Sequence, residues 1–192
     1  MDHRAEPVID RPLVSIRREY HLKWIGMSKS STVSVRRSPV QDASASGGSL
    51  VVQAETLTIE TTDRVELVDV TERLTGFVAG VQVGEGILSV WSLHTTCAVF
   101  INEAQQALHS DIRRALEQIV ARDTDWMHND PEQSDCDRSN ADAHLRAMLL
   151  GHSLTLQISG GEIVLGQWQR VLAAELDGPR SRTLRLQIMG VR

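Results

Sequence analysis

The chain begins to alternate between apolar and polar residues at Leu50, where it also becomes rich in β-branched side chains. This pattern predicts a strand over residues 50–62 and a second, shorter one over residues 65–70. The apolar residues then take on helical spacing, which predicts a helix that begins at Thr71 and ends before Gly84. The domain is therefore expected to open with two strands and a helix.

Two more helices are predicted further along the chain. A stripe of apolar residues predicts the longer helix over residues 104–122. Residues 141–150 predict a shorter helix that ends at Gly151. Between the two helices, residues 123–139 are acidic and irregular. The remaining predicted strands cover residues 86–93, 97–101, 153–158, 162–165, 167–174 and 183–191.

The predicted strands outnumber the helices, and short turns join most of them. Gly160-Gly161, for example, is typical of a hairpin turn. The pattern predicts an α+β fold, with a mostly antiparallel sheet and a few helices, in a single domain over residues 49–192. Residues 1–48 are predicted to be a disordered or non-domain tail. Their Ser-rich, weakly hydrophobic sequence cannot bury enough apolar surface to offset the entropy of ordering.

Net charge differs between the two parts of the chain. Residues 1–46 carry 8 basic and 5 acidic residues, a net charge of +3, whereas residues 47–192 carry 12 and 20, a net charge of −8. An acidic domain without a basic stripe argues against nucleic acid as the partner. No apolar run approaches the roughly 20 residues needed to span a bilayer, so no membrane partner is expected. The N-terminus lacks the pattern of a secretory signal, and the cytoplasm is the expected location.

Three histidines in polar settings are the candidate chemistry. They are His94 in S-L-H-T-T-C-A, His128 in W-M-H-N-D-P and His144 in N-A-D-A-H-L-R-A. Neutral imidazoles are common zinc ligands, and a catalytic metal site needs about three protein ligands and an open position. Each histidine has the alternative of being a hydrogen-bonded structural residue. Residues 175–182, E-L-D-G-P-R-S-R, add arginines whose planar guanidinium groups suit an anionic substrate.

These motifs resemble the YjbQ-like family, whose members are often described as secondary thiamine-phosphate synthases. The matching motifs are H-T-T-x-A-x-x-x-N-E, H-x-D, A-H-L-R-A-x-L-L-G, G-x-x-x-L-G-x-W-Q and E-x-D-G-P-R-x-R, in the family's order. The resemblance implies a compact α+β domain that forms a homotrimer and has a metal-linked pocket. It also implies an activity that joins a hydroxymethylpyrimidine diphosphate to a thiazole phosphate, with loss of pyrophosphate.

The resemblance also implies which residues form the site. The implied metal ligands are His94, His128 and His144, with zinc or magnesium as the divalent ion. The implied catalytic residues are Asn102, Glu103, Asp130 and Glu175, and the implied substrate- or phosphate-binding residues are Trp168, Gln169, Arg180 and Arg182. One departure is Asp142, which stands where many members have a further histidine. The expected partner is a small phosphorylated heterocycle.

The residues themselves leave alternatives open. Asn102-Glu103 lies between a predicted strand and a predicted helix, where such a pair can cap the helix. Asp130 is either a carboxylate that orients an imidazole or a solvated loop residue. Trp168 is either a core residue or a platform on which a heteroaromatic ring stacks. Arg180 either clamps a phosphate or only pairs with a nearby carboxylate.

The function has three alternatives. The first is the metal-dependent transferase that the resemblance implies. The second is a metal-holding, ligand-binding trimer without a dedicated catalytic role. The third is a metal-assisted hydrolase, in which a metal-bound water is the nucleophile. The same ligands serve all three, so the sequence does not separate them.

Overall fold

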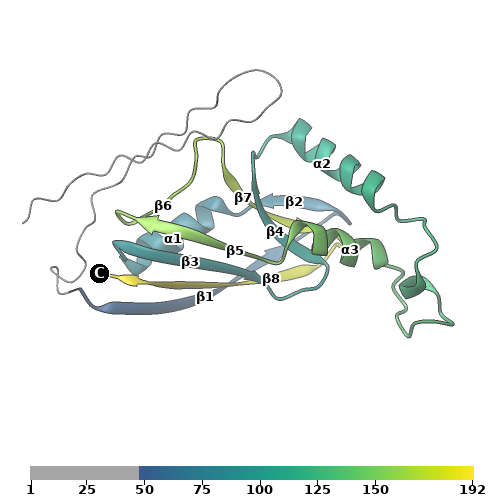
Figure 1. Ribbon diagram of the computed structural model, residues 1–192, viewed down its shortest axis with the longest axis horizontal. Coiled ribbons are helices and arrows are strands. Elements are labelled where there is room, and N and C mark those ends of the chain that lie inside the picture. Colours follow the sequence, from purple (N-terminus) through teal and green to yellow (C-terminus); the bar gives the residue numbers. More distant parts are fainter. Residues whose placement is uncertain (1–47) are drawn as a thin grey trace, which may run out of the picture. The chain divides into compact units, whose positions relative to one another are not determined.

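The strands and helices follow one another along the chain much as the pattern predicts. The computed structural model describes residues 48–192 (Figure 1), so the predicted tail lies outside the described residues except for Gly48. The strands are β1 (Leu50–Glu60), β2 (Glu66–Asp69), β3 (Glu85–Ser92), β4 (Cys97–Asn102), β5 (Ser153–Ser159), β6 (Glu162–Ile163), β7 (Arg170–Glu175) and β8 (Ser181–Val191). The helices are α1 (Thr71–Val81), α2 (Gln106–Ile119), the short 3-10 helix η1 (Met127–Asn129) and α3 (Ala141–Leu150). None of these described helices is long and apolar enough to cross a membrane.

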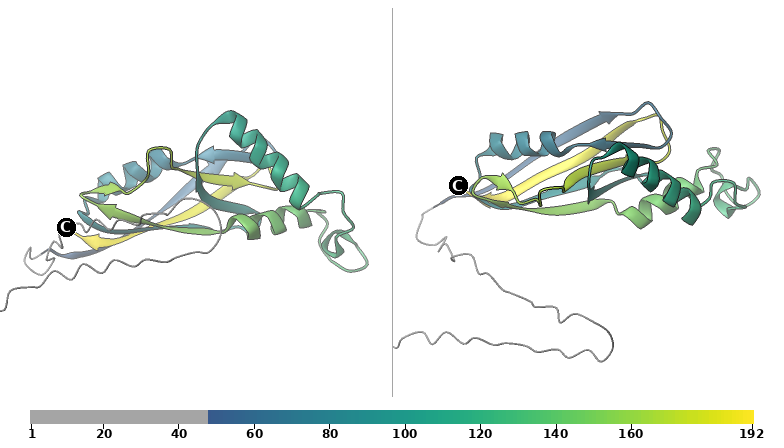
Figure 2. Two further views of the ribbon diagram at one scale, coloured as in Figure 1. Left: turned by 45° about the horizontal axis from the view of Figure 1, so that its top comes forward. Right: turned by 90° about the horizontal axis from the view of Figure 1, so that it is seen from above.

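The described strands form two sheets. The larger sheet has the order β1-β8-β3-β5-β6 and the smaller sheet the order β2-β7-β4. Every pair of neighbouring strands in them is antiparallel. Figure 2 shows α1 toward one end of the domain and α2 and α3 toward the other. The predicted α+β fold with mostly antiparallel pairing is confirmed, although the strands are divided between two sheets.

Three segments of the chain cross from one sheet to the other at the same strand ends. They are residues 61–65 between β1 and β2, residues 93–96 between β3 and β4, and residues 176–180 between β7 and β8. We call these three segments together the sheet junction. The backbone N–H of Leu176 donates to the carbonyl of Thr96 at 3.2 Å, and that of Gly178 donates to the carbonyl of Arg64 at 2.9 Å. The turn predicted at D-G-P-R is present, and it joins strands of different sheets.

The two faces of the smaller sheet are both covered. Inward-pointing residues of the larger sheet, among them Leu88, Ile158 and Leu186, are buried and pack against α1 and one face of the smaller sheet. The opposite face of the smaller sheet packs on α2 and α3 through Ala98 and Ala174. Because β7 is covered on both sides, its residues are buried in an unbroken run instead of alternately.

Two neighbouring strands in the chain, one in each sheet, are shorter than predicted. β6 covers only Glu162–Ile163, and β7 begins at Arg170, three residues later than the apolar pattern indicates. The cause is a turn, in which the backbone N–H of Gln169 donates to the carbonyl of Gly166 at 2.9 Å. The side-chain Oε1 of Gln169 also accepts from the Gly166 N–H at 2.8 Å. These bonds use backbone groups that a longer ladder would need.

Two glycines give a matched test of strand packing. A Cβ at Gly86 in β3 would lie 2.5 Å from the carbonyl oxygen of Met189 and 2.7 Å from the Cα of Gly190, whereas a Cβ at Gly76 in α1 would meet nothing within 4 Å. We expect Gly86→Ala to lower the free energy of unfolding by about 1–3 kcal/mol, as for overpacking. Gly76→Ala is expected to raise it by about 0.5–1 kcal/mol, because alanine favours a helix. Urea unfolding curves measure both, and equal midpoints would contradict the close approach of β3 and β8.

Candidate functional site

A buried ion pair stands at the centre of the sheet junction. Glu175 ends β7 and Arg182 follows the start of β8, and the two side chains are 1% and 3% exposed. The Arg182 Nε donates to Glu175 Oε2 at 2.6 Å, and its NH2 group donates to Oε1. Thr61 Oγ1 donates to Glu175 (3.2 Å), the Asp177 backbone N–H donates to Glu175 (2.8 Å), and Arg182 donates to Thr96 Oγ1 (2.9 Å). Each crossing segment therefore contributes a hydrogen bond to this pair.

The burial of this pair bears on its predicted roles. Glu175 is implied to be catalytic and Arg182 to bind substrate, but in the single chain both side chains have almost no surface to present to a ligand. Their charges face each other, and threonine and backbone groups meet the remaining hydrogen-bonding demand. In the structure, the pair instead links the three crossing segments of the sheet junction.

A second set of charges lies beside the pair. Asp177, 5% exposed, accepts hydrogen bonds from Arg64 at 3.1 Å, from Arg180 at 2.7 Å and from the Asn140 side-chain amide at 2.8 Å. The guanidinium of Arg138 lies 3.9 Å from the same carboxylate. Asp177, on the turn between β7 and β8, thus contacts side chains from well-separated parts of the chain.

Arg64 extends this set to α3. It donates to the fully buried Asp142 at 3.2 Å, and Arg146 approaches the other oxygen of Asp142 at 3.3 Å. Arg146 also pairs with Glu117 of α2. We call the four arginines and two aspartates the arginine–aspartate network: Arg64, Arg138, Arg146, Arg180, Asp142 and Asp177. Counting Glu117, four guanidinium groups meet three carboxylates, an excess of one positive charge in a domain of net negative charge.

Two of the three histidines lie together beside this network. His128 in η1 and His144 in α3 have ring centroids 5.0 Å apart, with the rings at 87° to each other. Burial lowers the pKa of His144 below its ordinary value, and the neighbouring His128 lowers it further. The charges of Asp177 and Asp142 act in the opposite direction. The Nε2 of His128 is buried and has no hydrogen-bond partner among the described residues.

His94 lies in the crossing segment after β3, on the side of the Glu175–Arg182 pair. Its Nε2 accepts a hydrogen bond from the backbone N–H of Thr183 at 2.8 Å. Burial lowers the pKa of His94 below its ordinary value, and the charge of Arg182 lowers it further, while Glu175 opposes the shift. The lowered pKa and the hydrogen bond that Nε2 accepts from the backbone both favour the neutral imidazole.

The three histidines do not fit a three-imidazole metal site as the single chain holds them. A metal ligand needs a free lone pair, and the Nε2 lone pair of His94 faces the Thr183 N–H. Within residues 48–192, no group of three or more His, Cys, Asp or Glu side chains is arranged to hold an ion. The zinc or magnesium site stays a prediction, and no step below is assigned to a metal.

Four residues implied by the resemblance lie at the far end of the smaller sheet. Asn102 pairs with Arg170 across β4 and β7, whereas Cys97 pairs with Glu175 at the junction. Asn102 follows Cys97 by five positions along the strand, a span of about 17 Å. We call the residues at the far end the far-end group: Asn102, Glu103, Trp168 and Gln169. Within one chain, the structure does not bring this group to the histidines.

Contacts and exposure settle two of the local alternatives, those for Asn102-Glu103 and for Trp168. The cap of α2 is Gln105, whose side chain accepts from the Leu108 N–H at 2.7 Å, so the alternative that Asn102-Glu103 caps this helix is wrong. Trp168 is 67% exposed, so the alternative that it is a core residue is also wrong. Asp130 accepts from the backbone N–H of Glu132 at 2.9 Å, which shows it in the turn after η1.

Sequence reasoning missed Arg64, which bridges two parts of the site. It lies in the short polar segment between β1 and β2, where an arginine is unremarkable in sequence. Its partners Asp142 and Asp177 lie 78 and 113 residues away along the chain. Asp142 stands out in the sequence because it departs from the family pattern. Nothing in the sequence, however, indicates that it binds Arg64.

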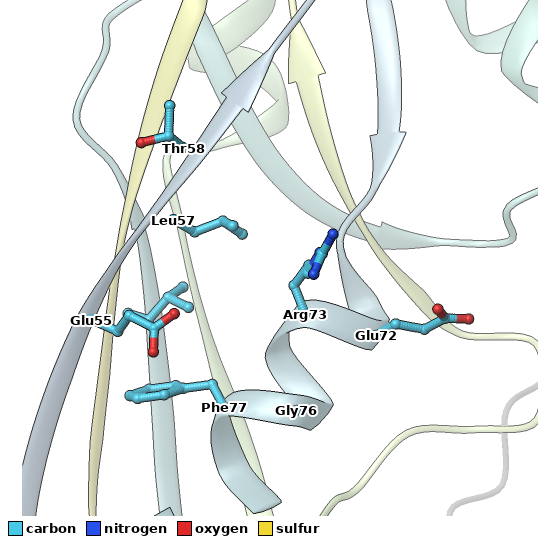
Figure 3. Close-up of a pocket in the computed structure, with 8 residues that line it drawn as sticks. Glu55, Leu57, Thr58, Glu72, Arg73, Gly76 and Phe77 are labelled. Carbon is cyan, nitrogen blue, oxygen red and sulfur yellow. The ribbon is translucent and has the colours of Figure 1, made fainter. Parts of the chain in front are cut away.

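A groove lies between β1 and α1, away from these residues. Its volume is about 420 Å³, and its lining includes Leu57 and Glu55 of β1 and Arg73 and Phe77 of α1. Figure 3 shows these side chains on the facing sides of the strand and the helix. None of the residues implied by the resemblance lines the groove. The candidate site is therefore the sheet junction.

Comparison with known proteins agrees with this fold and these motifs. Residues 55–191 match the model of the family described as UPF0047 protein YjbQ-like. The chain belongs to the YjbQ-like family. A UPF0047 protein of Methanothermobacter thermautotrophicus is 42% identical over 139 residues, covering 72% of this chain and 93% of the relative. The UPF0047 protein YugU of Bacillus subtilis is 30% identical over 137 residues, covering 71% and 98%.

Solved structures of similar proteins share the fold. A protein from Sulfolobus solfataricus matches with a TM-score of 0.69 and 30% identity, over 74% of this chain and 99% of that one. A protein from Aeropyrum pernix matches with a TM-score of 0.66 and 35% identity, over 72% and 98%. The YjbQ-like region of this chain therefore corresponds to nearly the whole of these relatives.

The buried pair leads to a prediction about stability. Arg182→Ala should lower the free energy of unfolding by about 3–5 kcal/mol, because it leaves Glu175 buried and unpaired. The matched control is Arg114→Ala, which breaks an exposed pair with Asp111 at 3.0 Å. It should cost no more than about 1 kcal/mol. Urea unfolding at pH 7 compares the two, and similar losses would show that the junction does not depend on this pair.

Proposed function

We propose that this YjbQ-like protein binds a small phosphorylated heterocycle at the sheet junction and acts as a thiamine-phosphate-synthase-like transferase. The proposed reaction joins a hydroxymethylpyrimidine diphosphate to a thiazole phosphate and releases pyrophosphate. The observation that carries the proposal is the excess positive charge of the arginine–aspartate network, which lies beside the histidines in an otherwise acidic domain.

The network has donors to offer an anion. Arg64 and Arg180 are 28% and 29% exposed, and Arg138 is 51% exposed. A guanidinium group has five N–H donors, and the contacts to aspartates occupy only part of them. Charge-assisted hydrogen bonds to phosphate oxygens are among the strongest in proteins. An anionic ligand would therefore balance the surplus charge.

The reaction needs charge stabilisation more than it needs acid or base catalysis. The bond between the pyrimidine methylene carbon and the diphosphate oxygen breaks, and its electron pair leaves with pyrophosphate. The thiazole nitrogen supplies the electron pair of the new carbon–nitrogen bond, so no proton has to move. Negative charge grows on the departing oxygen, and positioned donors such as Arg180 favour that step.

The proposal is tested by supplying both precursors to the full chain. We expect thiamine phosphate and pyrophosphate as products, and we expect Arg180→Ala to weaken pyrophosphate binding by about 1.5–3 kcal/mol, the scale of a hydrogen bond to a charged group. Arg114→Ala is the control, because it removes an arginine from the exposed face of α2. Titration calorimetry and product analysis measure the two effects.

The possible outcomes separate the candidate functions. Pyrophosphate binding without joined product would favour the ligand-binding alternative. Phosphate released from either precursor without joined product would favour the hydrolase. Equal binding by Arg180→Ala and the wild type would remove the network from the site.

We also propose that the protein is a homotrimer in which the far-end group of one subunit faces the sheet junction of the next. This arrangement is motivated by the 17 Å or so of strand that separates the two groups within one chain. The outer face of the larger sheet supports it. Val52, Ile87 and Met189 are register neighbours on that face and are 53%, 43% and 46% exposed. Such an apolar row is typical of a surface covered by another subunit, and a closed ring uses one interface repeatedly.

Subunit mixing tests the shared site. Light scattering should give three times the 21.3 kDa chain mass, and Met189→Glu should reduce that mass by placing a charge in the apolar row. Arg180→Ala and Glu103→Ala should each be nearly inactive alone. When the two variants are mildly dissociated and mixed, activity should return. Some sites then combine an intact far-end group from one subunit with an intact sheet junction from another. No gain on mixing would contradict a shared site, while a monomer would remove the trimer itself.

A further inference from the structure

The end of the ladder between β3 and β8 is completed by a side chain. The last paired residues of these strands are Ser92 and Leu184. One residue further, the Thr183 carbonyl still accepts from the Leu93 N–H at 3.1 Å. The Thr183 N–H lies on the same edge of β8, and β3 has no carbonyl left to meet it. The Nε2 of His94 takes that place at 2.8 Å.

This bond decides where the imidazole proton lies. A backbone amide can only donate, so the Nε2 of His94 must be the acceptor and cannot carry a hydrogen. A neutral imidazole has one N–H, which is then on Nδ1. The backbone thus fixes the tautomer of His94, as a second hydrogen bond usually does for a functional histidine.

The N–H of His94 has no partner within the described part of the chain. The imidazole is partly exposed, and its Nδ1 makes no hydrogen bond there. Thr183, to which the ring is tied, follows Arg180 by three residues, a span of roughly 10 Å of extended chain. A diphosphate group and the side chains that reach for it can cover such a span. His94 and Arg180 both lie in crossing segments of the sheet junction, and both side chains are partly exposed.

We propose that His94 is a hydrogen-bond donor that binds a phosphoryl oxygen of the ligand through Nδ1–H, and that it is not a metal ligand. This inference rests on the proposed function for the nature of the ligand. The tautomer itself rests only on the contact with Thr183. For Nδ1 to bind a metal, the proton would have to move to Nε2, where it would face the Thr183 N–H.

Two amide substitutions separate the two edges of the ring. In His94→Asn the side-chain amide nitrogen stands near the position of Nδ1, so the donor is kept and the contact with Thr183 is lost. In His94→Gln the amide reaches the position of Nε2, so its oxygen can accept from Thr183, and no donor stands at the position of Nδ1. The full chain is used for each variant, and circular dichroism checks that each one folds.

The readouts are pyrophosphate affinity, zinc affinity and the nitrogen NMR spectrum of His94. We expect the spectrum to show the proton on Nδ1. Pyrophosphate binding should weaken roughly 10- to 150-fold in His94→Gln, the fold-change that matches a hydrogen bond to a charged group. It should change less than about threefold in His94→Asn, since that variant retains a donor. Neither substitution should change the affinity for zinc.

Three results would overturn the proposal. They are a proton on Nε2, pyrophosphate binding by His94→Gln equal to the wild type, or a loss of zinc affinity in His94→Gln as large as that in His144→Gln. A wild-type protein that binds no pyrophosphate while its proton lies on Nδ1 is a separate outcome. That result would reject the proposed function and the proposed contact between His94 and a phosphoryl oxygen. The assignment of the proton to Nδ1 would remain.

Discussion

The buried pair of Glu175 and Arg182 is the contact on which the sheet junction depends. Two charges taken out of water are costly unless the geometry and the remaining hydrogen bonds compensate for the lost solvent. Here Thr61, Thr96 and the Asp177 backbone supply those hydrogen bonds, one from each crossing segment. The pair therefore requires all three segments to be in position together, and the two sheets are joined at a defined place.

This support explains how groups distant in sequence form one site. The turn between Glu175 and Arg182 carries Asp177 and Arg180, and Asp177 in turn binds Arg64 and Asn140. Asn140 precedes α3, the helix that carries His144 beside His128. On the other side of the turn, the tie between Thr183 and His94 aims the free edge of that imidazole. The partly exposed guanidinium groups of Arg64 and Arg180 thus lie beside a buried pair whose two charges cancel each other.

The fold was largely predictable because its signals are local. Alternation from Leu50, helical spacing after Thr71 and the stop at Gly151 each depend on neighbours within a few residues, and each is confirmed. The division into two sheets was not predictable, because a turn such as D-G-P-R looks the same whether it joins paired or unpaired strands. Turn bonds at Gly166 also shortened β7 in a way that an apolar run does not reveal.

The candidate site was predictable only in part. The histidines and arginines stand out as residue types, but their roles depend on partners that spacing does not show. Arg182 is buried against Glu175, whereas Arg180 is partly exposed, although the two lie two residues apart. The bond from Thr183 to His94 spans 89 residues, so the spacing of the motifs does not reveal that the Nε2 of His94 accepts from the backbone. The motifs likewise do not show that Asn102 and Cys97 lie at opposite ends of the smaller sheet.

The most direct measurement is a crystal structure of the full chain soaked with tungstate, an anomalously scattering analogue of phosphate, and separately with zinc. The account predicts a tungstate peak in contact with Arg180 and the Nδ1 of His94, with the Thr183 N–H still bound to Nε2. A zinc ion held by His94 together with His128 and His144 would contradict it, as would tungstate bound only in the groove between β1 and α1.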